Sequence, residues 1–516
     1  MTREPPSSRA GGAQEPAVRS GLAGGAYRPL RDNDMGRIHA TVLDLLEQVG
    51  VADPIPILRE RALERGCRMA DGNRLSFPRA LVEDALATPR REVFCYGRDS
   101  RHDLNLSGTR VNFYGGGEAV SILDHTTRRY RPSTLRDTYD LARLTDRLEY
   151  LHGYSRLTIP TEITDPLEAD INTAYASVAG TAKHISLSFA RAAHIEPVLE
   201  LLDLVAGGAG RFAQRPFCHG GGCCIISPLR YARDNSEVCI AAAKLGAPVW
   251  VLAAPQAGTT APAALAGTLA QSVAEALAAW LLVELVVPGH PVIVGAWPFV
   301  ADLRTGAFSG GGGECAVLNA AAAQMINHYG LVSTVGAGMT DSKLPDNQAG
   351  YEKALSVGLA AVAGCNGISE ATGMLASLMG CSYEAMVIDN EMLGCIQRAL
   401  RGIEVTDETL SFDVIRDTAL GKGLFLRHPQ TRKLMRSEYV YPHIADRRSR
   451  TEWEQAGAQG ILEHAHASAT ETLSTHYPDY ISPEADSRIR ARFPIRLAAE
   501  HMRPDPGHAA APSQQA

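Results

Sequence analysis

Three carboxylates of this sequence stand where acid–base chemistry or cation binding could take place. Glu314, Glu370 and Asp341 each follow an apolar run or open a helical pattern. A carboxylate in such a place can act as a general base, bind a cation or cap a helix. We take these three as candidate catalytic residues. Asp346 directly precedes a predicted helix, so for this residue we expect capping alone.

Aromatic residues gather near the ends of the apolar runs, where they could form a cage for a quaternary ammonium group. The face of an aromatic ring attracts a cation, and several rings together can surround one. Tyr114 and Trp297 are the strongest candidates. The other candidates, each of which could equally belong to the core, are Phe113, Tyr154, Phe189 and Tyr383.

The segment CHGGGCC offers four potential metal ligands, which are Cys218, His219, Cys223 and Cys224. Zinc-activated thiolate chemistry is one function for such a set. However, side chains alternate along a strand, so the adjacent Cys223 and Cys224 would point to opposite faces. The spacing also matches no zinc pattern. We therefore favour small buried thiols and expect no metal.

A glycine run at residues 310–313 leads into a predicted helix. Such a run can cradle a phosphate at the helix start, or it can allow another part of the chain to approach closely. The two common phosphate-binding patterns, GxxxxGK[ST] and GxGxxG, are absent here. Close approach is the favoured interpretation.

The elements that must position these residues alternate regularly along the chain. Eight apolar runs predict strands beginning at residues 110, 148, 184, 217, 248, 291, 331 and 364. Helical patterns predict helices at 133–147, 166–180, 194–206, 229–245, 262–286, 314–329, 347–363 and 383–401. Continuous apolar strands between helices are typical of a parallel sheet covered on both faces. Eight such units predict an α/β fold of the (β/α)8 TIM barrel type, with a doubly wound sheet as the alternative. In a barrel, the loops after the strands share one face, and the candidate residues fall there.

The barrel is expected to span residues 110–401, with additions on both sides. Residues 28–130 predict N-terminal helices and a small β region, and residues 402–502 a helical segment capping one end. Residues 1–27 and 503–516 are rich in Pro, Gly, Ser and Ala, which predicts disordered tails.

Composition excludes some classes of protein. The chain of 516 residues has a net charge of −7, which argues against a general nucleic-acid binder. The very apolar stretch 263–287 contains Gln271, Glu275 and Glu284, which favours a buried helix over a membrane span. That helix could be barrel shell or a subunit contact, so a homo-oligomer stays open.

Ten dispersed cysteines without an export signal predict reduced thiols in the cytoplasm.

Four further segments carry a family resemblance. They are GGGECAVLNAAAAQMINHYGL, GMTDSKLPDNQAGYEKAL, SYEAMVIDNEMLG and HPQTRKLMRSEYVYP, in this order between residues 309 and 442. Together they resemble the trimethylamine methyltransferase family. RIHATVLDLLEQVGV and NFYGGGEAV are also similar to it, so the resemblance covers about residues 28–500.

The resemblance implies a TIM barrel that carries out corrinoid-dependent methyl transfer. A methylated amine would bind at the barrel mouth, and a separate corrinoid protein would present Co(I) to take the methyl group, with no cofactor tightly bound to this chain. Archaeal members that use trimethylamine contain pyrrolysine, whereas this chain has standard residues only. It therefore resembles the branch without pyrrolysine, which includes glycine betaine methyltransferases. We expect a quaternary amine such as a betaine, although a tertiary amine stays open.

The chemistry of a quaternary amine suits such a site. Its nitrogen already carries the positive charge that lets the amine leave as a neutral molecule, and Co(I) is the nucleophile. The protein then has to align the methyl group and exclude water. Within this frame, the expected substrate-binding residues are Tyr114, Glu118, Tyr154, Arg156, Trp297, Lys343 and Gln348, with His184 as a further donor. The glycines expected to let the corrin ring approach are Gly115, Gly116, Gly117, Gly221, Gly311 and Gly312.

Two other functions stay open at this point. One is a different TIM-barrel enzyme, such as a metal–thiolate methyltransferase that uses the CHGGGCC segment. The other is a betaine-binding protein without catalytic activity. Stoichiometric zinc would favour the first, and binding without methyl transfer would favour the second.

Overall fold

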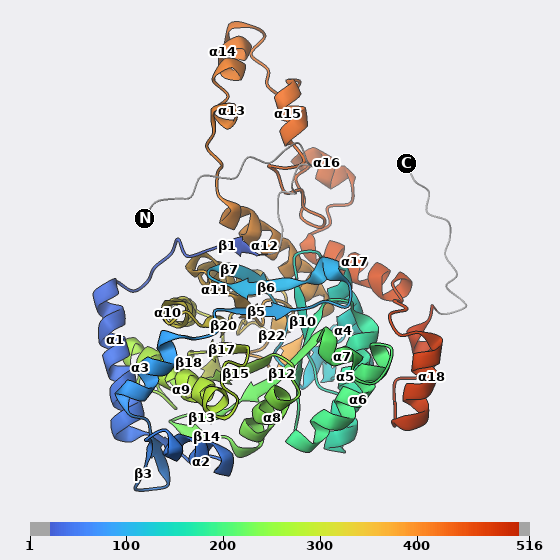
Figure 1. Ribbon diagram of the computed structural model, residues 1–516. Helices are drawn as coiled ribbons and strands as arrows, with labels where there is room; N and C mark the ends of the chain where they lie inside the picture. Colours follow the sequence, from blue (N-terminus) through green and yellow to red (C-terminus); the bar gives the residue numbers. More distant parts are fainter. Residues whose placement is uncertain (1–20, 505–516) are drawn as a thin grey trace.

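A closed barrel of eight parallel strands forms the centre of the chain (Figure 1), whose structure is a computed structural model that describes residues 21–504. The barrel strands are β7 (Arg110–Phe113), β10 (Gly153–Ser155), β11 (His184–Ser188), β12 (Cys218–Cys223), β15 (Val249–Ala253), β17 (Val292–Ala296), β20 (Val332–Gly336) and β21 (Gly367–Ser369). From β10 onward each pairs in parallel with the next, and β21 pairs with β7. A parallel bridge between Tyr114 and Gly153 closes the ring. The predicted (β/α)8 barrel is confirmed.

A long helix follows each barrel strand and packs outside the ring (Figure 1). These helices are α4 (Leu135–Arg147), α5 (Pro166–Gly180), α6 (Ile195–Val205), α8 (Arg233–Lys244), α9 (Leu265–Val286), α10 (Gly313–His328), α11 (Asn347–Ala363) and α12 (Tyr383–Arg401). Capping side chains fix several of their starts. Asp346 accepts a hydrogen bond from the Ala349 backbone N–H at 3.0 Å, which confirms its predicted role as the N-cap of α11.

Helix α9 is apolar on all sides because other elements cover all of it. Its inner face packs on β15 and β17, and its outer face packs on α1 (Asp32–Asp44) and α2 (Pro56–Glu64). By length and composition it could cross a membrane, but 89% of its most apolar window is buried inside the protein. The predicted buried helix is confirmed, and its apolar surface belongs to the barrel shell.

The N-terminal region lies along one side of the barrel. It contains α1, a π-helical turn (Leu45–Val49), α2 and α3 (Arg79–Ala87). Its short strands join two strands from the loop after β12 in a five-stranded sheet, made of β2 (Val51–Ala52), β3 (Arg68–Ala70), β4 (Arg74–Ser76), β13 (Ile225–Ile226) and β14 (Arg230–Tyr231).

A hairpin from the N-terminal region fills the base of the barrel. Its strands are β5 (Glu92–Cys95) and β6 (Leu104–Ser107), and they pair antiparallel. Four of its side chains form a buried cluster with Tyr114, Ile293 and Val332 of the barrel; they are Val93, Cys95, Leu104 and Leu106. The hairpin therefore supplies the floor on which an internal cavity can rest.

Two small sheets are built from the loops after the strands. One contains β8 (Ser121–Leu123), β9 (Tyr130–Pro132), β22 (Met374–Leu375) and β23 (Gly380–Cys381). The other contains β16 (Gln256–Ala257), β18 (Phe299–Asp302) and β19 (Ala307–Ser309). They brace the loops that carry most of the candidate residues.

The C-terminal segment is helical, as predicted. Helix α17 (Ile461–Thr475) packs on α4 and α12, and α18 (Pro483–Arg492) packs on α6. Three short helices project away from the barrel (Figure 1), namely α13 (Asp407–Leu410), α14 (Phe412–Leu420) and α15 (Pro429–Leu434). Between α17 and this projection lies α16 (Arg450–Gln455).

The two expected tails fall mostly outside the described residues, so their disorder stays a prediction. One part of the first tail is ordered. Residues 22 and 23 belong to the tail that the sequence predicts to be disordered, but they form strand β1 (Leu22–Ala23). This strand pairs antiparallel with the first half of β7. The free edge of β7 supplies the hydrogen-bonding partners that composition alone could not reveal.

Candidate active site

A cavity of about 380 Å³ lies inside the barrel, and residues from all eight strands or the loops after them line it. Its polar and aromatic lining includes Tyr114, Glu118, Arg156, Phe189, Trp297 and Glu370. The structure therefore brings together five expected binding or catalytic residues and one further aromatic candidate. The expected loop residue Gly117 lines the same cavity.

Glu370 is a strongly perturbed carboxyl group of the cavity. It directly follows β21, has a left-handed backbone (φ 64°) and is 5% exposed. Its Oε2 atom has no hydrogen-bond partner among the described residues. Burial, with the neighbouring Glu118 charge, raises the pKa of this carboxyl to about 8. Strained backbone, an unpartnered oxygen and a raised pKa together make Glu370 the leading candidate for a functional carboxylate.

Glu118 is held in the opposite state, ionised and paired. It accepts hydrogen bonds from Arg156 Nη2 at 2.9 Å and from the Ser188 hydroxyl. The side chain is 43% exposed at the mouth of the cavity. Partial desolvation raises its pKa, but the charge and hydrogen bond of Arg156, with Ser188, outweigh this effect and leave the pKa below its usual value. Of the three carboxylates that line the cavity, Glu118 is thus charged and Glu370 neutral at pH 7, a division typical of active sites. The third, Asp170, is hydrogen-bonded to His194.

Three hydrogen-bond donors of the cavity are unused. Arg156 Nε, Trp297 Nε1 and the Tyr114 hydroxyl are buried and have no hydrogen-bond partner among the described residues. Buried donors are nearly always paired, so unpaired ones in a cavity indicate a ligand that would pair them. Trp250, from β15, adds another aromatic wall. The arrangement can hold a cation near Glu370 and the rings, and an anionic group near Arg156 and Trp297.

Tyr154 does not reach the cavity. Its side chain is fully buried, and its hydroxyl donates to the Thr138 carbonyl of α4 at 3.1 Å. Side chains alternate along β10, so Ser155 lines the cavity and Tyr154 packs between barrel and helix. Its expected role in substrate binding is not supported.

A second group of predicted residues lies around a separate surface hollow of about 450 Å³. Glu314, Asp341, Gly311 and Gly312 line this hollow. Asp341 accepts hydrogen bonds from the Ser309 hydroxyl at 2.5 Å and the Gly310 N–H at 2.8 Å. It therefore ties two loops together, and Glu314 is exposed. Neither carboxylate shares the cavity that holds Glu370.

Lys343 and Gln348 belong to the same outer network. Lys343 is exposed and donates to the Asp341 carbonyl at 2.6 Å, and Gln348 donates to Glu352 at 3.0 Å. The polar residues of 338–353 thus hydrogen-bond mainly to one another, shaping the loop before α11. They do not bind in the cavity.

Most of the glycines expected to let the corrin ring approach are instead needed because a Cβ atom there would clash with other residues of this chain. A Cβ atom at Gly221 would lie 1.9 Å from the Trp250 carbonyl oxygen, and one at Gly311 would lie 2.4 Å from the Glu352 carboxyl carbon. Gly115 lies against Leu157. A Cβ at Gly117 would lie 2.4 Å from the Met374 sulfur and 2.9 Å from Glu370 Oε2. These glycines therefore make room for neighbouring groups of this chain. A Cβ at Gly116 or Gly312 would meet only ordinary contacts, at 3.4 and 3.5 Å.

The four ligand candidates of the CHGGGCC segment do not converge. Cys224 Sγ lies 3.2 Å from Cys239 Sγ, and the Cys223 thiol donates to the Ile225 carbonyl at 3.3 Å. Burial raises the pKa of the Cys218 thiol. The prediction that adjacent cysteines point apart is confirmed, which removes this set as a metal cluster.

Comparison with known proteins decides the family. A model of the trimethylamine methyltransferase (MTTB) family matches residues 3–500. The chain belongs to this family. It is accordingly a methyltransferase, as the resemblance implied.

Two relatives of this methyltransferase match nearly its whole length. Trimethylamine methyltransferase MttB of Desulfitobacterium hafniense (strain DSM 10664 / DCB-2) is 33% identical over 91% of this chain and 93% of its own. Glycine betaine methyltransferase of Desulfitobacterium hafniense (strain Y51) is 29% identical over 90% of this chain and 96% of its own. The monomethylamine methyltransferase MtmB of Methanosarcina barkeri, a crystal structure, is 13% identical with a TM-score of 0.45 over 85% of this chain and 93% of that one.

Trp250 and Ser188 are among the cavity residues of this methyltransferase that sequence reasoning missed. Trp250 was hidden inside a predicted strand, although alternation with Val249 and Val251 could have placed it inside the barrel. Ser188, which holds Glu118, carries no distinctive local pattern. His184, expected as a carboxylate donor, lies at the base of the barrel and bonds to Tyr96 and His219.

Proposed function

We propose that this methyltransferase removes a methyl group from a quaternary amine that also carries a carboxylate, such as glycine betaine, and transfers it to a corrinoid presented by a partner protein. One observation carries the proposal. The Glu370 carboxylate and the donors of Arg156 and Trp297 line the same aromatic cavity, and each has an atom without a hydrogen-bond partner among the described residues. The glycine betaine methyltransferase among its relatives supports the substrate class.

The trimethylammonium head of the substrate would lie near Glu370 and the aromatic walls. A methylated ammonium cannot donate a hydrogen bond, so it is recognised by charge and by ring faces. Tyr114, Phe189, Trp250 and Trp297 line the cavity with Glu370. Because the cavity is buried, the attraction between carboxylate and cation is stronger there than in water.

The carboxylate of a betaine would pair with the opposite set of groups. Arg156 already gives one nitrogen to Glu118, which fixes its orientation and leaves its Nε–H free. Trp297 Nε1 supplies a second donor. A zwitterion would thus satisfy groups of both signs, whereas trimethylammonium would leave both donors unpaired.

The corrinoid supplies the reduced cobalt that accepts the methyl group, while the chain aligns the amine and excludes water. The cavity of about 380 Å³ is near the lower limit of ligand pockets, about 300 Å³. It suits a small amine and not a corrin ring, which fits an acceptor that reaches the amine from the mouth. As the C–N bond breaks, its electron pair stays on nitrogen. The tertiary amine leaves neutral and loses its attraction to Glu370.

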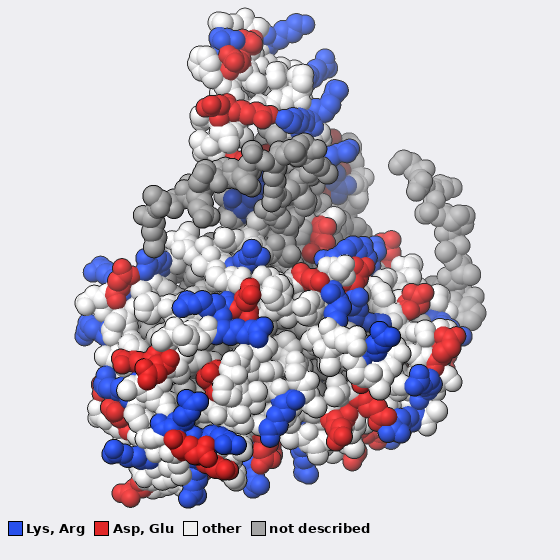
Figure 2. Space-filling view, in the orientation of Figure 1, with Lys and Arg blue, Asp and Glu red and all other residues white. Residues whose placement is uncertain are grey.

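Other properties of the protein are inferred on the same basis. All ten cysteines are free thiols, which supports a reducing compartment and thus the cytoplasm. Acidic and basic side chains are interspersed on the face in Figure 2, which supports the absence of nucleic-acid binding. Exposed Ile403, Phe412 and Leu420 on or beside the projecting helices support contact with another protein or a second copy.

Affinity for glycine betaine is expected to increase with pH. Free Glu370 has a pKa of about 8, so it is mostly neutral at pH 7, and a cation favours its ionised form. Below pH 8, binding should release a proton, and Kd should fall by up to about tenfold per pH unit until Glu370 is ionised. Isothermal titration calorimetry from about pH 6.5 to 9, in buffers of different ionisation enthalpy, measures both effects. A Kd that stays constant, with no proton released, would contradict the assignment of Glu370 to the cation.

A further inference from the structure

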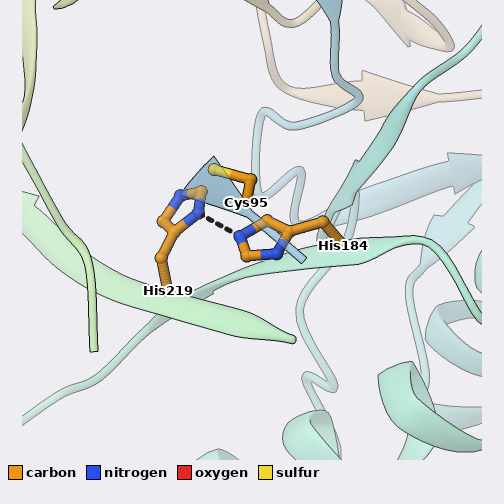
Figure 3. A group of neighbouring side chains, drawn as sticks. All are labelled: Cys95, His184 and His219. Atoms are coloured by element: carbon orange, nitrogen blue, oxygen red, sulfur yellow. Dashed lines mark hydrogen bonds between the residues drawn. The ribbon is translucent and has the colours of Figure 1, made fainter. Parts of the chain in front are cut away.

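Three potential metal ligands converge beneath the cavity, at the base of the barrel. Figure 3 shows Cys95 from β5, His184 from β11 and His219 from β12 facing one another. One ligand atom from each lies within 4.8 Å of the others. Cys95 and His184 are 0% exposed and His219 is 5% exposed. The three come from segments far apart in sequence, so their convergence is a product of the fold.

The hydrogen bonds of His184 leave one nitrogen available to a metal. Its Nδ1 lies 2.7 Å from the Tyr96 carbonyl oxygen, which can only accept, so Nδ1 carries the hydrogen. Nε2 then presents its lone pair toward His219 Nδ1, 2.7 Å away. A histidine whose second nitrogen is held by a carbonyl is the usual form of a metal-binding histidine.

Both histidines are neutral, as metal ligands must be. Burial lowers the pKa of His184 to about 4 and lowers that of His219 well below its usual value. Burial raises the pKa of the Cys95 thiol to about 12, so an incoming cation would displace the thiol proton to solvent.

Tyr114, which also lines the amine cavity, lies next to this set of ligands. Its side chain is buried, and its hydroxyl has no hydrogen-bond partner among the described residues. The Cys95 thiol adjoins this hydroxyl, and the Tyr114 ring stands edge-on to His219 with centroids 6.5 Å apart. The hydroxyl thus adjoins the Cys95 member of the ligand set, between that set and the amine cavity.

We propose that Cys95, His184 and His219 bind one zinc ion at the base of the barrel, with the fourth position directed toward Tyr114 and the amine cavity. One thiolate and two imidazoles are typical zinc ligands, whereas calcium and magnesium prefer oxygen. Tetrahedral zinc would place the two nitrogens about 3.3 Å apart, so His184 and His219 have to separate only slightly. The ion would fasten the β5–β6 hairpin to the barrel and complete the cavity floor. The expectation from the sequence was no metal.

The proposal is independent of the amine substrate and is tested by metal analysis of the full-length protein. Protein produced with zinc is expected to contain one zinc per chain. After zinc removal, Co²⁺ should give tetrahedral visible bands and a thiolate-to-cobalt charge-transfer band in the near ultraviolet. Wild-type protein that retains no zinc and shows no such cobalt spectrum would overturn the proposal.

Two variants locate the ion. Cys95→Ser should lose the thiolate band and weaken zinc binding at least a hundredfold, and His184→Gln should reduce zinc content as well. Cys67→Ser removes another buried thiol, outside the ligand set, and should keep both zinc and the band. A second group of potential ligands lies elsewhere in the protein. It consists of His125, Glu384 and His466, whose ligand atoms also lie within 4.8 Å of one another. Zinc that survives in Cys95→Ser and His184→Gln but is lost in His466→Gln would place the ion there and overturn the proposal.

Discussion

Replacing Glu370 with glutamine is expected to weaken glycine betaine binding by about 30- to 150-fold. Glutamine keeps the shape of the side chain and removes its charge. Opposite unit charges about 6–8 Å apart attract by about 2–3 kcal/mol at an effective dielectric constant of about 20. The loss should be largest above pH 8, where the wild-type carboxyl is ionised. The pH dependence of Kd should disappear in the variant. Calorimetric titration at about pH 7 and pH 9 measures both effects.

A matched control is available in the second hollow. Glu314 was an equal candidate in the sequence, but it is exposed and lies outside the barrel cavity. Glu314→Gln is therefore expected to bind glycine betaine as the wild type does. If Glu314→Gln loses affinity and Glu370→Gln keeps it, the cation site has been assigned to the wrong carboxylate.

Stability measurements separate lost binding from lost folding. The folded-state pKa of Glu370 is raised from 4.5 to about 8, so its ionisation opposes folding. The free energy of unfolding should decrease as pH rises from about 4.5 to 8, and the decrease should be complete above 8. Glu370→Gln, which cannot ionise, should therefore be more stable than the ligand-free wild type at pH 9, by a few kcal/mol. Urea unfolding followed by circular dichroism measures this difference.

Replacing Arg156 with glutamine is expected to separate betaines from other quaternary amines. Glycine betaine should bind about a hundredfold more weakly, because its carboxylate loses a charged donor in a buried site. Choline has the same trimethylammonium head without a carboxylate, so its affinity should change by less than about threefold. Loss of Arg156 also removes the ion-pair partner of Glu118, so the pKa of Glu118 should rise. Paired titrations of both ligands measure the ratio.

One result would contradict the assignment of Arg156 to the substrate carboxylate. Equal losses for glycine betaine and choline would show that Arg156 supports the cavity without contacting the carboxylate. Circular dichroism spectra matching those of the wild type would exclude a loss of folding as the cause. The choline measurement is therefore the internal control for this variant.

The barrel could be predicted because its signal is local. Each apolar run was long enough for one buried strand, and each helical pattern matched the space between two strands. The position of Glu370 directly after β21, and of Glu118 and Arg156 after β7 and β10, follows from that alternation. These residues share a cavity because the strand ends of a barrel lie on one face.

The remaining residues depended on information that local patterns do not contain. In the loop after β20, Asp341 accepts a hydrogen bond from Ser309 of another loop and Lys343 donates to the Asp341 carbonyl, so neither side chain lines the cavity. Tyr154 required the exact inward and outward register of β10, which a three-residue strand does not reveal. Cys95 reaches His184 only because a distant hairpin fills the base of the barrel, a contact between elements that no periodicity encodes.

Methyl transfer itself tests the central claim most directly. Under argon, the protein is mixed with glycine betaine and chemically reduced cob(I)alamin, or a reduced corrinoid protein, and the Co(I) absorbance is followed. We predict formation of methylcobalamin and dimethylglycine in equal amounts, dependent on both protein and substrate. Tight betaine binding without methylcobalamin would indicate a binding protein, and no reaction with glycine betaine, carnitine, proline betaine or choline would contradict quaternary-amine methyl transfer.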